Sequence, residues 1–148
     1  MRFIKYAPIL IVIFCAACSP KLVGEAETVR LDYWDREALE GMPKEEYVDD
    51  SNGLDIFVRA VDSAEELKDQ KVITTKPLLS LEFIMESDEN RNYHLWITDE
   101  GAGYFQSLAP HKNLTYQIDS ESIEELNEFF AMKENVDVLQ EDIEFEQH

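Results

Sequence analysis

The strongest constraint on the fold is the alternation of apolar and polar residues in four short segments between Pro77 and Ile118. Alternation with a period of two places the apolar side chains of an extended chain on one face, which is typical of strands covered on one side only. The linker DEGAG, residues 99–103, contains the glycines that a tight hairpin needs. We therefore predict an antiparallel meander whose strands are residues 77–86, 93–98, 104–108 and 114–118.

Two other stretches carry apolar residues at helical spacing. The first predicts a helix over about residues 53–68, with Ser51 or Asn52 as its cap. In the second, Ser122 and Glu125 have the spacing of a capping box at the start of a helix. The apolar stripes are Ile56, Phe57, Ala60, Val61 and Ala64 in the first helix, and Ile123, Leu126, Phe129 and Phe130 in the second.

The remaining segments complete a single α+β domain. Residues 28–34 alternate like a further strand, whereas the polar, turn-rich residues 35–53 indicate a loop. Residues 135–148 fit either a last edge strand or a disordered acidic C-terminal tail. The predicted fold is an antiparallel meander sheet of four or five strands with two helices packed on one face, in a domain over residues 29–134.

Residues 1–17 have the order of features of a secretory signal peptide. Arg2 and Lys5 precede a short apolar run, and small residues then lead to Cys18. The apolar run is shorter than the roughly 20 residues that a spanning helix needs. The segment resembles a bacterial lipobox, in which the cysteine thiol receives a diacylglycerol before cleavage makes that cysteine the new N-terminus. Cys15 departs from the usual leucine of this pattern.

Cys15 and Cys18 also form a C-x-x-C pair, which in a folded domain would suggest redox or metal chemistry. Here the pair straddles the expected cleavage site, so Cys15 would be discarded and Cys18 acylated. Two acyl chains give stable membrane anchoring, whereas one binds only marginally. We therefore predict a lipoprotein held at the extracytoplasmic face of the cell membrane through diacylglycerol on Cys18, with residues 18–28 as a lipid-anchored tether.

The charge of the chain limits its partners. The formal net charge is −19, and removal of the signal peptide would take away two positive charges and no negative one, giving −21. Such a body repels nucleic acid and anionic lipid head groups, so no nucleic acid partner is expected. The same acidity attracts cations loosely.

The order of several motifs resembles a known family. A helix of the type IFVRAVDSAEEL is followed by an extended stretch, by YHLWI with a glycine-containing turn, by YQI, and by a helix of the type SIEELNEFF. This order is similar to the YhfM-like domain of lipoproteins from Bacillus and related Firmicutes, over roughly residues 54–132. The resemblance implies a lipid-anchored extracytoplasmic protein. It supplies no catalytic residues.

Metal and catalytic patterns are weak in this sequence. His94, His111 and His148 lack the helical pairing of a zinc site, and no nucleophile motif is present. Oxygen-bearing side chains concentrate around the turns at residues 47–55 and 86–92, but neither matches a complete calcium loop. We predict no cofactor and no bound metal, and we interpret most of the acids as a solvated surface.

One pair of aromatic residues suggests an interaction surface. His94 and Trp96 alternate with Tyr93, Leu95 and Ile97, so they belong on the sheet face that the helices leave uncovered. An exposed tryptophan there could anchor an envelope protein or another envelope component. The alternative is that the N-terminal strand or the C-terminal tail covers it. The favoured function is a non-enzymatic binding module; the alternatives are a divalent-cation binding or sensing lipoprotein and, with less support, an envelope enzyme.

Overall fold

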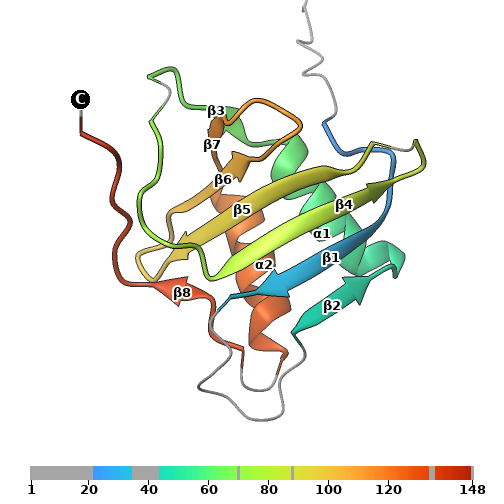
Figure 1. Cartoon of the computed structure of the whole chain (residues 1–148). Coiled ribbons are helices and arrows are strands. Elements are labelled where there is room, and N and C mark those ends of the chain that lie inside the picture. Colours follow the sequence, from blue (N-terminus) through green and yellow to red (C-terminus); the bar gives the residue numbers. More distant parts are fainter. Residues whose placement is uncertain (1–21, 35–43, 70, 88, 134–135, 148) are drawn as a thin grey trace, which may run out of the picture.

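The computed structural model describes residues 22–34, 44–69, 71–87, 89–133 and 136–147. They form an α+β domain in which an open, mainly antiparallel sheet packs on two helices (Figure 1). The strands are β1 (Ala26–Tyr33), β2 (Glu45–Val48), β3 (Glu65–Glu66), β4 (Leu79–Met85), β5 (Arg91–Thr98), β6 (Gly103–Ser107), β7 (Thr115–Gln117) and β8 (Leu139–Gln140), and the helices are α1 (Ser51–Asp62) and α2 (Ser120–Ala131).

The predicted meander is confirmed, because β4, β5, β6 and β7 are antiparallel neighbours in chain order. The full order is β2-β1-β4-β5-β6-β7-β3, and β8 pairs in parallel with the end of β5. The 8-stranded sheet exceeds the predicted four or five strands. Two strands were missed, and each has a physical reason: β2 is a polar edge strand, and β3 contains only two residues and leaves no alternation to detect. Strand β8 lies within residues 135–148, for which a last edge strand was one of the two predicted alternatives.

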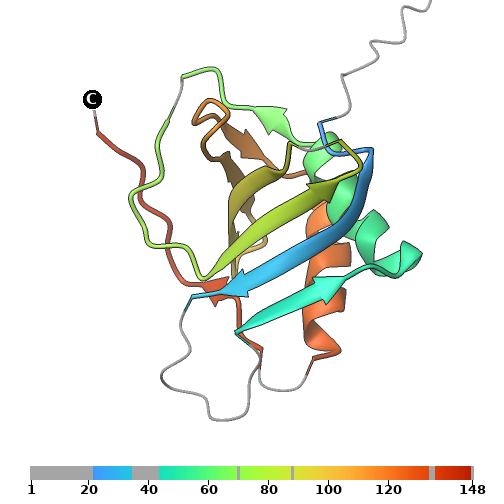
Figure 2. The same cartoon turned by 45° about the vertical axis from the view of Figure 1, so that its right-hand side comes forward.

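The two helices lie on the same side of the sheet, as predicted (Figure 2). Helix α1 ends at Asp62, before the predicted limit, because residues 65–66 turn away to pair with β7. The predicted caps were wrong. Asp50 caps α1 by accepting the N–H of Gly53 at 2.8 Å, and Asp119 caps α2 by accepting the N–H of Ser122 at 2.9 Å. Aspartate with extended backbone angles is a strong cap, so each helix begins directly after it.

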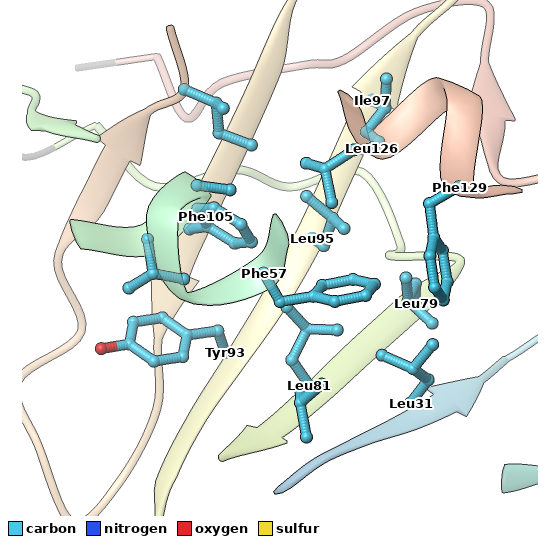
Figure 3. Packing of buried hydrophobic residues seen from close by; sticks show 14 of the residues in the cluster. Leu31, Phe57, Leu79, Leu81, Tyr93, Leu95, Ile97, Phe105, Leu126 and Phe129 are labelled. Atoms are coloured by element: carbon cyan, nitrogen blue, oxygen red, sulfur yellow. The ribbon is translucent and has the colours of Figure 1, made fainter. Parts of the chain in front are cut away.

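The core lies between the helices and the inner sheet face (Figure 3). Phe57 of α1 is fully buried and meets Phe129 of α2 edge-on, with ring centroids 5.0 Å apart. Leu31 of β1 and Leu81 of β4 pair across the sheet beneath these rings. The two helices therefore join the sheet through aromatic side chains, and the opposite sheet face is left for other contacts.

The N-terminal part of the domain begins earlier than expected. Val23 is fully buried, and the carboxylate of Asp62 accepts the backbone N–H groups of Leu22 and Val23 at 2.7 and 2.9 Å. Residues 22–28, predicted as part of a free tether, thus belong to the folded domain. Val23 is a single apolar residue between breakers, which gives no periodic signal in the sequence.

Candidate functional site

The outer sheet face, opposite the helices, is covered over one half by two short segments. Residues 72–75 run antiparallel to residues 144–146, with an isolated bridge between Ile73 and Phe145. The N–H of Thr74 donates to the carbonyl of Glu144 at 2.9 Å. The ring of Phe145 lies edge-on against Tyr104 of β6, with centroids 5.3 Å apart. We call residues 72–75 and 144–146 the strap.

Trp96 lies beneath the strap. Its side chain is on the outer face as predicted, but it is only 1% exposed, and its indole N–H donates to the carbonyl of Thr75 at 3.0 Å. The hypothesis of an exposed Trp96 was therefore wrong, and the alternative of a covering by the C-terminal tail is confirmed in part. The contribution of residues 72–75 was not predicted, because it depends on a contact between distant segments.

In the described part of the chain, no segment comparable to the strap lies over the other half of the outer face, across β1, β4 and the start of β5 (Figure 1). The strand register sets its side chains in rows. Arg30 pairs with Glu82, which pairs with Asn92, and in the next row Asp32 pairs with Ser80, which pairs with His94. Trp34 follows Tyr33, the last residue of β1, at the end of these rows. We call this half the open face.

Trp34 is fixed on the open face although it is 45% exposed. Its indole N–H donates to the hydroxyl of Ser80, with Nε1 and Oγ 2.6 Å apart, and its ring meets His94 edge-on at 5.4 Å between centroids. The ammonium group of Lys76 lies 5.8 Å from the centroid of the same ring. A large aromatic side chain is thus held in one position with much of its surface in solvent.

His94 extends this chain of contacts. The Oγ of Ser80 lies 2.7 Å from Nδ1 of His94, and the imidazole ring meets Trp96 edge-on on its other side. Burial lowers the pKa of His94, which favours the neutral ring. Because Ser80 accepts from Trp34, its own proton can point to Nδ1, and the ring proton then sits on Nε2. His94 would thus present an N–H donor beside Trp34.

The charges of the open face centre on Arg30. Its guanidinium group lies 3.0 Å from Asp32 and 2.8 Å from Glu82, and Glu45 lies 3.9 Å away. The hydrogen bond with Asp32 is the main reason that the pKa of Arg30 is raised, against a smaller opposing effect of burial. Tyr47 pairs with Arg30 in the register and is 54% exposed. The carboxylates here are engaged by one guanidinium.

An open groove of about 710 Å³ lies between α1 and α2. Most of its carboxylates have structural partners: Asp62 holds the N-terminal segment, and Arg59 pairs with Asp55 at 2.8 Å and with Glu125 at 3.0 Å. Burial alone would raise the pKa of Asp119, but hydrogen bonds from Ser63 and Ser122 outweigh it and lower the pKa. Most polar side chains that line the groove are thus engaged in contacts within the domain.

In the two turns considered for calcium, several side-chain oxygen atoms are used in contacts within the domain. Asp50 caps α1, and the side chain of Asn90 accepts the N–H of Met85 and donates to Glu82. Within the described residues, no group of three or more His, Cys, Asp or Glu side chains is placed to hold a metal ion. Nε2 of His111 is buried, has no hydrogen-bond partner among the described residues and lies 3.9 Å from Glu89. His148 lies outside the described residues.

Trp34 is the functional candidate that the sequence reasoning missed. The signal was available, because Trp34 alternates with Val29, Leu31 and Tyr33 and so falls on the same outer face as His94. Its position at the end of a strand, before a polar segment, made it less conspicuous than the central Trp96. Of the predicted pair, the structure leaves His94 half-buried at the open face and places Trp96 under the strap.

The fold and the open face define a two-layer α+β domain in which the described residues leave half of the outer sheet face uncovered. The family described as YhfM protein matches residues 39–135, so the chain belongs to the YhfM family. The match contains the predicted core of residues 54–132. No curated protein and no solved structure matches the chain.

The predicted signal peptide and Cys18 lie outside the described residues. Among the helices of the described part, none is long and apolar enough to cross a membrane.

Proposed function

We propose that the protein is a lipid-anchored lipoprotein of the extracytoplasmic face of the cell membrane and acts as a non-enzymatic binding module. The anchor is supported by the sequence: a cationic start, a short apolar run and small residues before Cys18. The binding role is supported by one observation above the others, the half-exposed but immobilised ring of Trp34. Because contacts within the domain already hold this ring in one position, a partner that binds it loses little further side-chain entropy.

The direction of β1 supports this arrangement. The described chain starts at Leu22, four residues after Cys18, and β1 then leads from Ala26 toward Trp34 (Figure 1). Eight strand residues at about 3.3 Å each span roughly 26 Å. A lipid on Cys18 would hold the Leu22 end near the membrane and present Trp34 and the open face further out.

The anchor is tested by mass spectrometry of the N-terminal peptide. Trypsin cleavage after Lys21 should release Cys18-Ser-Pro-Lys carrying a diacylglyceryl group on the thiol. Cys18→Ser should abolish the lipid and leave the signal peptide attached. Cys15→Ser is the matched control and should leave the lipid unchanged, because residue 15 is removed with the signal peptide. A mature N-terminus other than Cys18, or loss of the lipid only in Cys15→Ser, would reject the anchor.

The binding role is tested by photo-crosslinking in cells. A photoreactive phenylalanine analogue replaces Tyr47 on the open face, and in the control it replaces Met132, which is 78% exposed at the end of α2. We expect a discrete crosslinked product from position 47 that Trp34→Ala removes, and none from position 132. Equal products from both positions, or no product from position 47 at normal expression, would count against a binding surface on the open face.

A further inference from the structure

We infer that the ligand of the open face is a neutral saccharide that stacks on Trp34. This inference rests on the proposed binding role and adds the chemical class of the ligand. It depends on three observations about the open face: a fixed aromatic ring, a mixture of hydrogen-bond donors and acceptors beside it, and a local charge close to zero.

The first observation is the geometry of Trp34. A sugar ring presents a face of C–H groups, which packs on the electron-rich face of an indole ring. Such stacking needs a ring that is both exposed and held still. The bond to Ser80 and the edge-on contact with His94 fix the indole ring, while 45% of the residue's surface stays in solvent. Trp96 cannot take this role, because it is 1% exposed beneath the strap.

The second observation is the polar surroundings. Sugar hydroxyl groups both donate and accept, so they are matched by side chains of both kinds within reach of the stacking ring. The open face offers donors in Arg30 and in Nε2 of His94, which has no hydrogen-bond partner within the described residues. It offers acceptors in Asp32 and Glu82, whose orientation is set by Arg30. Planar groups held in this way present fixed directions to a ligand.

The third observation is the charge. Among the described residues, the charged side chains of the open face are Arg30 and Lys76, which are positive, and Asp32, Glu45 and Glu82, which are negative, a formal total of −1. The formal net charge of the whole chain is −19, so the other residues of the chain together carry −18. A polyanion would be repelled by the body as a whole, whereas a polycation would find carboxylates that Arg30 already engages. An uncharged, hydroxyl-rich ligand fits this patch best.

A protein partner fits less well. A stable protein interface buries about 800 Å² on each side around an apolar centre. Of the large hydrophobic side chains that are exposed in the described part of the chain, only Trp34 and Tyr47 lie on the open face. Two aromatic residues among charged groups resemble a sugar platform more closely than the centre of a protein interface.

The test is calorimetric titration of the full chain, in detergent micelles, with two uncharged oligosaccharides, tetra-N-acetylchitotetraose and maltotetraose. We expect saturable binding of at least one of them. Trp34→Ala should weaken it by roughly tenfold or more, because a central aromatic anchor is lost. Met132→Ala removes a more exposed side chain outside the open face and should leave the affinity unchanged. The indole N–H signal of Trp96 in an NMR spectrum reports whether each variant keeps its fold.

The outcomes separate this inference from the proposed function. Absence of saturable binding to both sugars, or binding that survives in folded Trp34→Ala, would overturn the saccharide inference. If the crosslinked product at position 47 still forms and still needs Trp34, the binding module stands and its ligand belongs to another class, a protein being the first to consider. If neither the sugars nor the crosslink depends on Trp34, both proposals are wrong.

Discussion

Trp34 donates its indole N–H to the hydroxyl of Ser80, 46 residues away in the sequence, at 2.6 Å. This bond connects the end of β1 to the start of β4, and Ser80 continues the contact to His94 of β5. Three strands thus hold one half-exposed ring. The contacts from Trp34 through Ser80 to His94 fix the geometry of the open face.

Ser80→Ala should loosen Trp34 without unfolding the domain. We expect the free energy of unfolding to fall by about 1 kcal/mol, the usual effect of a lost hydrogen bond. The indole N–H signal of Trp34 should move and broaden in an NMR spectrum, while that of Trp96, bonded to Thr75, should stay. Ser87→Ala, at an exposed serine outside the open face, is the control. An unchanged Trp34 signal in Ser80→Ala would show that this bond does not fix the ring.

His94 should make stability depend on pH in mildly acid solution. Burial lowers its pKa below the value of about 6.5 in an unfolded chain, so the unfolded state binds more protons in this range. Stability is therefore full above the unfolded pKa and falls as the pH drops from 7 toward the folded pKa. Urea unfolding between pH 7 and 5 should show a steeper loss for the wild type than for His94→Gln. Parallel curves would contradict the assignment.

Removal of the tail should expose Trp96. Trp34→Phe leaves Trp96 as the only tryptophan of the chain, since the sequence contains two. Deletion of residues 141–148 in this background should shift the fluorescence of Trp96 to longer wavelength. It should also cost roughly 2 kcal/mol, because two backbone hydrogen bonds of the strap are lost. Deletion of residues 147–148 keeps the strap and is the control. An unchanged emission after the longer deletion would mean that residues 72–75 alone cover Trp96.

The N-terminal cap of α1 is Asp50 in the structure, whereas the sequence favoured Ser51 or Asn52, and two substitutions test the difference. Asp50→Ala should lower the free energy of unfolding by about 1 kcal/mol, because the N–H of Gly53 loses its acceptor. Asn52→Ala, at one of the two caps favoured by the sequence, should have little effect, since Asn52 is exposed within the first turn. Thermal unfolding of both variants decides between them. A larger loss in Asn52→Ala would contradict the observed cap.

Local patterns predicted those parts of the fold that depend on one segment at a time. The alternation around Leu81 and Leu95 located β4 and β5, and the apolar stripe through Phe57 located α1. The glycine-containing turn after β5 also formed as predicted, and Gly101 there has a φ of +87° that side chains rarely adopt.

The parts that sequence reasoning missed depend on contacts between distant segments. Val23 is buried because Asp62 holds the backbone of Leu22 and Val23, and Trp96 is covered where its indole N–H donates to the carbonyl of Thr75. Neither contact leaves a periodic signal. The open face needed the strand order, since only the pairing of β1 with β4 brings Trp34 to Ser80. The neighbours of a tryptophan at the end of a strand depend on which strands pair with it, and the local sequence does not specify that pairing.

The central claim is that a partner in the envelope covers Trp34, and hydroxyl-radical labelling in intact cells tests it without knowledge of the ligand. Radicals oxidise exposed tryptophan and methionine side chains, and mass spectrometry measures each site. In the purified chain, Trp34 and Met132 should react and Trp96 should not, in line with exposures of 45%, 78% and 1%. In cells, we predict that Trp34 becomes protected while Met132 stays reactive. Equal oxidation of Trp34 in cells and in the purified chain would contradict the account.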